Sequence, residues 1–186
     1  ETGKSSVSLR TERGILPVVD VDGDVVSVNM GQPQLDWREV PLARDVDLNA
    51  LPIDGEPGAA GMGNPHCVFV VDDVDAVDLA KVGPIYEHHE LFPERTNVEY
   101  IQILDRENIR MRVWERGGMI TLACGSGACA VAVVAHQKGL TERKVTIHLE
   151  GGPLDIDWRD DGVWMTGATQ LVFSGVLSSD FLDTIK

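Results

Sequence analysis

The sequence has few cysteines and no long apolar run. Its 186 residues include three cysteines, Cys67, Cys124 and Cys129. An odd number of cysteines in a chain of this length argues against a disulfide framework and favours a reducing compartment, so we expect a cytoplasmic protein. The longest apolar run, residues 128–135, is far shorter than the roughly 18–20 residues that a membrane helix needs. The sequence therefore predicts no membrane association.

Positive charge is scarce, and the common cofactor motifs are missing. Thirty acidic residues face 16 basic ones, which gives a net charge of -14. An acidic surface repels phosphate backbones, so we expect no nucleic-acid partner. The sequence contains no P-loop, no Rossmann glycine fingerprint, no lysine-centred pyridoxal motif and no Gly-x-Ser-x-Gly elbow. We accordingly expect no cofactor.

A metal centre is not indicated either. Cys124 and Cys129 are five residues apart, a spacing that turns two helical thiols to different faces, and no further Cys or His completes a zinc motif.

Short alternating and apolar runs, separated by Gly, Pro and Asp, predict many short strands. The expected strands cover residues 6–11, 15–21, 25–30, 67–71, 97–104, 109–115, 145–149, 154–158, 163–166 and 171–176. Residues 37–60 are typical of a linker with one short strand, and residues 75–86 have helical spacing. A second helix over 128–138 is rich in Ala and Val and ends at Gly139. Because this helix is apolar on nearly all sides, we predict an α+β fold with antiparallel strands wrapped around it.

The segment around Cys124 carries the sharpest chemical signal. Cys124 directly precedes the second helix, in a turn with Gly125, Ser126 and Gly127. The first N–H groups of a helix have no internal partner and carry the positive end of its dipole. They can stabilise a thiolate or hold a carboxylate, and the glycines would let a ligand approach the backbone. The alternative is a small buried cysteine before a glycine turn. Cys129 also fits a buried structural cysteine, because it lies inside the helix on an apolar stretch.

Three other places offer polar groups suited to an amino acid. Asn64 and His66 precede a buried strand, where the Asn amide could hold the ligand and the His could tune a thiol. Glu115 and Arg116 end a strand and could pair with an ammonium and a carboxylate. Asn97 begins a strand. The alternatives are turn residues for Asn64 and Asn97 and a surface ion pair for Glu115 and Arg116.

Taken together, these motifs resemble those of the diaminopimelate epimerase family. The segments that carry the resemblance are Gly63-Asn64-Pro65-His66, Phe92-Pro93, Asn97-Val98, Glu115-Arg116-Gly117 and Ala123-Cys124-Gly125-Ser126-Gly127-Ala128-Cys129, followed by residues 151–154 and 165–167. They occur in this order and span essentially the whole chain.

The resemblance implies both a fold and a reaction. The fold has two pseudo-symmetric halves, each with strands around a central helix, and the active site lies between them. The reaction interconverts LL- and meso-diaminopimelate, a step of lysine and peptidoglycan precursor synthesis, by two cysteines without pyridoxal phosphate or metal. The family suggests a homodimer. The implied catalytic residues are Cys124, His66 and Glu115, and the implied substrate contacts are Asn64, Asn97, Glu115, Arg116, Gly125 and Ser126.

The sequence departs from the family pattern in two ways. The family's first half carries the other catalytic cysteine in a Cys-Gly-Asn-Gly turn, which neither Cys67 nor Cys129 matches. We therefore expect this chain to begin after that turn, with one half incomplete and one acid–base group lacking. The expected division is residues 1–36 for the remaining strands of the first half, 37–168 for the Cys124 half, and 169–186 for a strand returning to the first half. The second departure is Met119 and Ile120, where the family often has Gly and Glu.

Other functions remain open at this level. Proline or hydroxyproline epimerases and phenazine-type isomerases share the cysteine at a helix start. A hydrolase could pair Cys124 with His66, and a ligand-binding half without activity is a third alternative.

Overall fold

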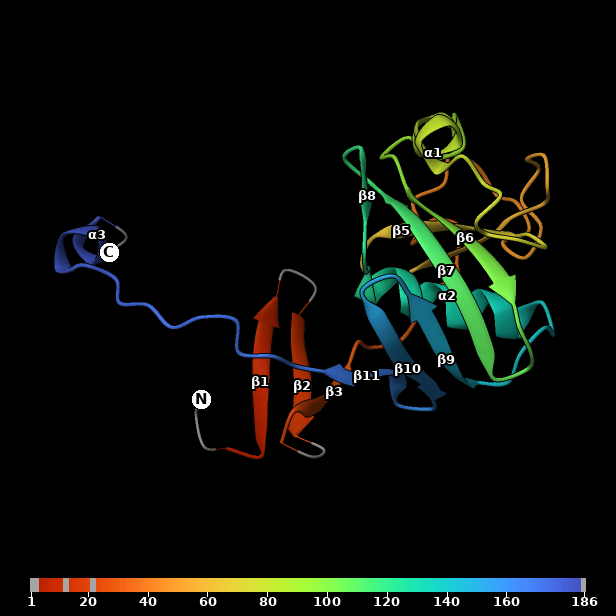
Figure 1. The fold of residues 1–186 in the computed structure, drawn as a ribbon. Helices are drawn as coiled ribbons and strands as arrows, with labels where there is room; N and C mark the ends of the chain where they lie inside the picture. The colour runs from red at the N-terminus through yellow and green to blue at the C-terminus, as the bar shows by residue number, and fades with distance from the viewer. Residues whose placement is uncertain (1–3, 12–13, 21–22, 185–186) are drawn as a thin grey trace.

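The computed structural model describes residues 4–11, 14–20 and 23–184. Within them one sheet of eleven strands curves around a single long helix, α2 (Gly125–Gln137) (Figure 1). The strands are β1 (Ser6–Thr11), β2 (Gly14–Asp20), β3 (Val25–Asn29), β4 (Gly58–Gly61), β5 (Pro65–Val70), β6 (Asn97–Ile103), β7 (Asn108–Glu115), β8 (Met119–Thr121), β9 (Lys144–Leu149), β10 (Gly152–Arg159) and β11 (Gly162–Ala168). Their order is β1-β2-β3-β11-β10-β9-β7-β6-β5-β4, and β8 pairs with β7 outside this path.

The sheet is mixed, whereas the sequence predicted antiparallel strands. Most neighbours are antiparallel, including β6 with β7, as expected. However, β5 runs parallel to β6, and β7 runs parallel to β9. Parallel neighbours need a long crossover, and here the crossovers contain the two longer helices: α1 (Leu79–Glu87) lies between β5 and β6, and α2 lies between β7 and β9. The alternation pattern reported strand positions but carried no information about strand direction.

Helix α2 is the centre of the main core. All residues from Gly127 to Ala135 are buried, as predicted for a helix that is apolar on nearly all sides. They pack against apolar residues of the surrounding strands, among them Val68, Ile101 and Ile147. Gly139 follows the helix with φ +73°, which confirms it as the glycine of the C-terminal cap.

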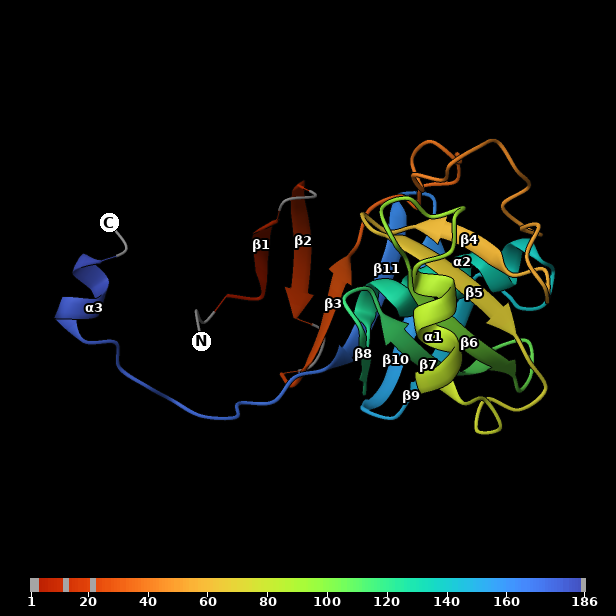
Figure 2. The ribbon, with the colours of Figure 1, turned by 90° about the horizontal axis from the view of Figure 1, so that it is seen from above.

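A second core covers the opposite face of β4, β5 and β6. Phe69 and Tyr100 form a cluster with Leu79 of α1 and with apolar residues of the segment 37–57, and α1 and this segment lie outside the sheet in Figure 2. Phe69 and Tyr100 stack with ring centroids 4.8 Å apart. This part of the sheet is therefore held rigidly between two apolar layers, and β5 and β6 carry the predicted site residues from this support.

Strands β1–β3 and the C-terminal segment lie outside both cores. The three strands continue the sheet beyond β11 and stand apart from the α2 body in both views (Figures 1 and 2). The predicted strand over 171–176 is wrong: the segment pairs with no strand in the described part of the chain and leads to α3 (Ser179–Asp183). Its apolar residues face solvent, with Phe173 81% and Val176 98% exposed. Apolar alternation makes a strand only where a neighbouring edge accepts its hydrogen bonds.

None of the helices among the described residues is both long and apolar enough to cross a membrane.

Candidate active site

The parallel pairing of β5 with β6 brings His66, Asn97 and Glu99 to one face of the sheet. His66 lies opposite Asn97 in the register, and Val68 lies opposite Glu99. Because side chains alternate along a strand, these polar groups share the face that packs on α2, while Cys67, Val98 and Tyr100 face the second core. The face that contains His66 and Glu99 is also the one that meets the start of α2.

A chain of hydrogen bonds joins Asn64, His66 and Glu99. The His66 Nδ1 lies 2.6 Å from Oε1 of Glu99, and the His66 Nε2 lies 3.0 Å from Oδ1 of Asn64. His66 and Glu99 are fully buried, and Asn64 is half-buried. Burial raises the pKa of the Glu99 carboxyl; His66 lowers it, Glu115 raises it, and the net result lies above the ordinary value. Of the three side chains, Asn64 alone reaches the surface.

Asn97 ties together the two loops that carry other predicted site residues. Its Nδ2 donates to the Pro65 carbonyl at 2.9 Å, and its Oδ1 accepts from the Arg116 backbone N–H at 2.9 Å. The side chain is buried. The structure therefore uses Asn97 to fix the position of Arg116 relative to the Asn64 loop.

Glu87 holds the same loop from the other side. Its carboxylate is buried and accepts from Nε1 of Trp114 at 2.7 Å and from the Gly117 N–H at 2.9 Å. Burial raises the pKa of Glu87, but these two donors, together with His88 and Arg95, hold it below its ordinary value. Sequence reasoning missed Glu87, because its only signal is an acidic residue at the end of an amphipathic helix.

We expect Glu87→Gln to loosen the loop that carries Arg116. A glutamine has one acceptor oxygen for two donors, so Trp114 or Gly117 would lose its partner, at about 1–3 kcal/mol. Since the pKa of Glu87 is lowered in the folded state, its stabilisation is present above the unfolded value of 4.5 and is lost as pH falls below it. Urea unfolding at pH 7 and pH 4 measures the free energy of unfolding of both proteins. The difference in this free energy between wild type and Glu87→Gln should be smaller at pH 4 than at pH 7.

The matched control is Glu90→Gln, since Glu90 is exposed and lies close by in the chain. Equal stability of the two variants at pH 7 would contradict the role of Glu87.

Glu115 and Arg116 lie at the end of β7, as predicted, but they do not pair with each other. Glu115 accepts a hydrogen bond of 2.5 Å from the Thr121 hydroxyl of β8. The Arg116 side chain is exposed, and within the described part of the chain its one hydrogen bond is to the Glu94 carbonyl, at 3.5 Å. The surface ion pair considered from the sequence is therefore not formed, and the guanidinium remains accessible to an anion.

Cys124 is the N-cap residue of α2, with extended backbone angles, and is 8% exposed. Burial, followed by the nearby charge of Glu99, raises the pKa of the Cys124 thiol to about 11. The Gly127 N–H and the Ser126 hydroxyl, 3.7 Å from Sγ, lower it, and Glu115 raises it. The sequence predicted a stabilised thiolate at the helix start. Here burial and the neighbouring carboxyl outweigh the helix N–H groups, so Cys124 is a protonated thiol at neutral pH.

We expect this shift to appear in the alkylation of Cys124 by iodoacetamide. The thiolate is the reacting form, so a pKa of about 11 in place of 9.0 lowers the rate near pH 8 by about 100-fold. The rate should rise up to about pH 11. Mass spectrometry of the folded protein measures the rate at each cysteine, and fully buried Cys67 and Cys129 serve as internal controls. A half-maximal rate below pH 9 would contradict the raised pKa.

The two glycines after Cys124 make room for protein side chains. A Cβ at Gly125 would lie 2.9 Å from Sδ of Met165, and one at Gly127 would lie 2.8 Å from Oε1 of Glu99. The sequence predicted that these glycines allow a ligand to approach. In the structure their space is taken by Met165 and Glu99, so they allow close packing around Cys124.

The other two cysteines cannot meet a ligand at this site. Cys67 faces the second core, and burial raises the pKa of its thiol well above the ordinary value. Cys129 is buried inside α2. Cys124 is therefore the cysteine that the described residues place beside polar groups.

The structure thus brings together most of the predicted residues, in three groups. His66 and Asn64 join Glu99, and Asn97 joins the backbone of Arg116. Gly125 and Ser126 form the first turn of α2 beside Cys124. Sequence reasoning missed Glu99, although one signal was present: it is the only acidic residue within a strand that is otherwise apolar or polar and uncharged.

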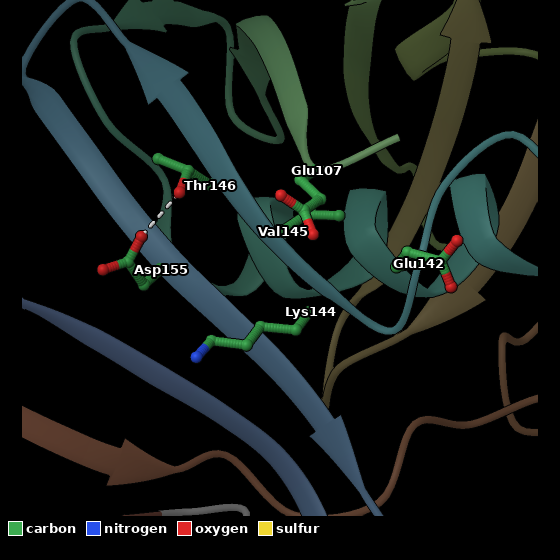
Figure 3. A pocket seen from close by; sticks show the side chains of 6 residues that line it. All are labelled: Glu107, Glu142, Lys144, Val145, Thr146 and Asp155. Atoms are coloured by element: carbon green, nitrogen blue, oxygen red, sulfur yellow. Dashed lines mark hydrogen bonds between the residues drawn. The ribbon is translucent and has the colours of Figure 1, made fainter. Parts of the chain in front are cut away.

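Two hollows are lined by residues of β9 and β10. One of about 570 Å³ reaches Ala123, directly before Cys124, and is lined also by Gly151, Gly152 and Gly167. The other, of about 250 Å³, lies against β9 and β10 and is lined by Glu107, Glu142, Lys144, Val145, Thr146 and Asp155 (Figure 3). In it Asp155 accepts from Thr146, and Glu142 pairs with Arg106. It contains none of the predicted site residues. The described residues contain no group of three His, Cys, Asp or Glu side chains that could hold a metal ion.

Comparison with known proteins gives consistent matches. The family described as diaminopimelate epimerase matches residues 58–172. The diaminopimelate epimerase of Rhodospirillum centenum is 49% identical over 187 residues, which cover 97% of this chain and 64% of the relative. That of Acidiphilium cryptum is 45% identical over 188 residues, covering 98% of this chain and 68% of the relative. The chain therefore spans about two thirds of the length of these relatives.

Solved structures share the fold at low sequence identity. A predicted epimerase from Pseudomonas aeruginosa superimposes with a TM-score of 0.64 and 18% identity, over 96% of this chain and 70% of that one. A hydroxyproline epimerase from Agrobacterium vitis, solved with bound trans-4-hydroxy-L-proline, superimposes with a TM-score of 0.64 and 15% identity. The match covers 90% of this chain and 57% of that one.

Proposed function

This chain belongs to the diaminopimelate epimerase family, and we propose that it takes part in interconverting LL- and meso-diaminopimelate, with Cys124 as one of two acid–base thiols. The observation that carries the proposal is the Cys124 thiol at the start of α2, where N–H groups without intrahelical partners meet a group that can give or take a proton. The reaction needs no cofactor in this scheme, because both proton transfers are made by side chains.

The raised pKa of Cys124 supports a part as the acid in the reaction. An epimerase needs a base on one face of the α-carbon and an acid on the other. Because the pKa of Cys124 is raised to about 11, this thiol is ready to deliver a proton to a carbanion formed on its side. In the reverse direction it becomes the base, and proximity of the substrate ammonium would then favour its thiolate form.

The surrounding groups fit an amino-acid substrate. As the α-proton leaves, negative charge builds up on the substrate carboxylate, and N–H groups at a helix start stabilise such charge without a metal. Gly125 and Ser126 supply these groups. Asn64 and the accessible guanidinium of Arg116 are further donors for a carboxylate, and Glu115 is the acceptor for an ammonium. Asn97 positions Arg116 by accepting a hydrogen bond from the Arg116 backbone N–H. His66 contacts Asn64 through Nε2 and so positions the Asn64 amide.

We further propose that the second thiol belongs to a first half of the fold. Neither Cys67 nor Cys129 can fill the role, because both are buried away from the Cys124 site. Residues 1–36 and 169–186 belong to that first half, and residues 37–168 form the Cys124 half. The strands β1–β3 and the exposed apolar residues after 168 support this division, because they lie outside the α2 core. We also propose a reducing compartment, the cytoplasm, because a catalytic thiol has to stay reduced.

The hydrolase alternative has less support. A Cys/His hydrolase needs its histidine within hydrogen-bond reach of the thiol. Both ring nitrogens of His66 are engaged by Asn64 and Glu99.

The test is proton exchange at the α-carbon. The chain is incubated with LL-diaminopimelate in deuterated water, and the α-proton signal is followed by NMR. The same assay uses a chimaera in which the part of the Rhodospirillum centenum relative that this chain does not cover completes it. Exchange in either protein supports the proposal. Absence of exchange in both folded proteins contradicts it, and exchange of proline in place of diaminopimelate would select the proline racemase alternative.

A further inference from the structure

Glu99 is a buried carboxyl that does not contact the substrate in the proposed reaction. It lies within β6 and has no exposed surface. Oε1 lies 2.6 Å from Nδ1 of His66, and Oε2 has no hydrogen-bond partner among the described residues. An unpaired buried polar atom costs about 1–3 kcal/mol. Because packing alone does not offset the cost of this unpaired oxygen, Glu99 calls for a further role.

The partners of His66 define where its protons are. Nε2 faces Oδ1 of Asn64, a carbonyl oxygen that can only accept, so Nε2 carries a hydrogen. Nδ1 lies 2.6 Å from Oε1 of Glu99, so a second hydrogen bond fixes the ring at its other nitrogen.

This arrangement decides which end of the Asn64 amide faces outward. The Nε2 hydrogen holds the Asn64 oxygen on the inner side, which leaves the NH₂ group on the outer side. That NH₂ group makes no hydrogen bond in the part of the chain that the structure describes, and Asn64 is the one member of the three that reaches the surface. An influence of Glu99 on a ligand can therefore pass through His66 and Asn64.

Resting on the function proposed above, we propose that Glu99 is a positioning residue for substrate binding. It holds His66 with its Nε2 hydrogen toward Asn64, and His66 holds the Asn64 amide with its NH₂ group free to donate to the carboxylate of an amino acid. Without the Glu99 contact the ring of His66 loses its anchor at Nδ1, and the amide of Asn64 is no longer held in one orientation.

The variants Glu99→Leu and Glu99→Gln test this relay. Replacing a buried ionisable group by an apolar one of similar volume is often tolerated, and circular dichroism checks that both variants fold. Glutamine can donate from its amide to Nδ1 and keep the Nε2 hydrogen, so it should rescue. By calorimetry we expect meso-diaminopimelate to bind about tenfold more weakly to the Leu variant, the effect of one lost substrate hydrogen bond. Binding to the Gln variant should stay within about threefold of wild type.

Two further readouts separate positioning from a general structural role. In ¹H–¹⁵N spectra the Nε2 hydrogen of His66 should exchange slowly in wild type and Glu99→Gln, and quickly in Glu99→Leu. Asn64→Ala with Glu99→Leu should bind no more weakly than Asn64→Ala alone, because both changes remove the same contact. Additive losses, or a slowly exchanging Nε2 hydrogen in the Leu variant, would overturn the proposal. If neither the chain nor the chimaera binds diaminopimelate, the proposed function fails, and the exchange of the Nε2 hydrogen still decides the role of Glu99.

Discussion

Replacing Cys124 by serine should reduce α-proton exchange of diaminopimelate by about 10²–10⁴-fold, the range attributed to a positioned acid or base. A hydroxyl is a far weaker acid than a thiol, so a serine at this position could neither deliver nor accept the proton on its face at a useful rate. The fold should survive, because serine is nearly the same size and Cys124 makes no cap hydrogen bond that serine would lose. NMR in deuterated water measures the exchange, with the substitution made in the chain or in the chimaera, whichever is active.

The matched control for this prediction is Cys129→Ser. Cys129 lies in the same helix and is fully buried, so a change there alters stability without touching the face that carries Cys124. Loss of exchange in Cys129→Ser but not in Cys124→Ser would refute the assignment of the thiol.

Gly127→Val should lower both stability and exchange strongly. A Cβ at this position would lie 2.8 Å from Oε1 of Glu99, 3.0 Å from Cε of Met111 and 3.2 Å from Sγ of Cys124. Glu99 is held by His66, so the strain must move Cys124 or the start of α2. Overpacking of this kind costs about 1–3 kcal/mol, and a displacement of the thiol by about 1 Å lowers the rate by about 10²-fold. Urea unfolding and the exchange assay measure the two effects.

Val133→Ala is the matched control for Gly127→Val. Val133 is buried in the same helix, and at 1.5 Å per residue it lies about 9 Å farther along the axis than Gly127. Its truncation should lower stability by a similar amount and leave exchange nearly unchanged. If both variants lose exchange in proportion to stability, Gly127 has no specific effect on Cys124.

The sequence was sufficient for the elements that depend on local pattern. The helix after Cys124 is apolar on nearly all sides, and burial of Gly127–Ala135 confirms the consequence drawn from it. Most strands also lie where alternation predicted them. The position of Cys124 at the start of α2 was visible because a cysteine between small residues before a helix is a local feature. Membership of the diaminopimelate epimerase family was visible for the same reason, from motifs a few residues long.

Other properties depended on contacts between segments far apart in the chain. The parallel pairing of β5 with β6, which places His66 beside Glu99, depends on a crossover that no alternation pattern encodes. The thiolate predicted for Cys124 was wrong because its pKa depends on burial and on Glu99, 25 positions earlier in the chain. The strand predicted over 171–176 was wrong because a strand needs a partner edge. The sequence by itself determined which groups are available for chemistry. Only the tertiary structure decided their protonation and orientation, because these are set by desolvation and by neighbours brought together in space.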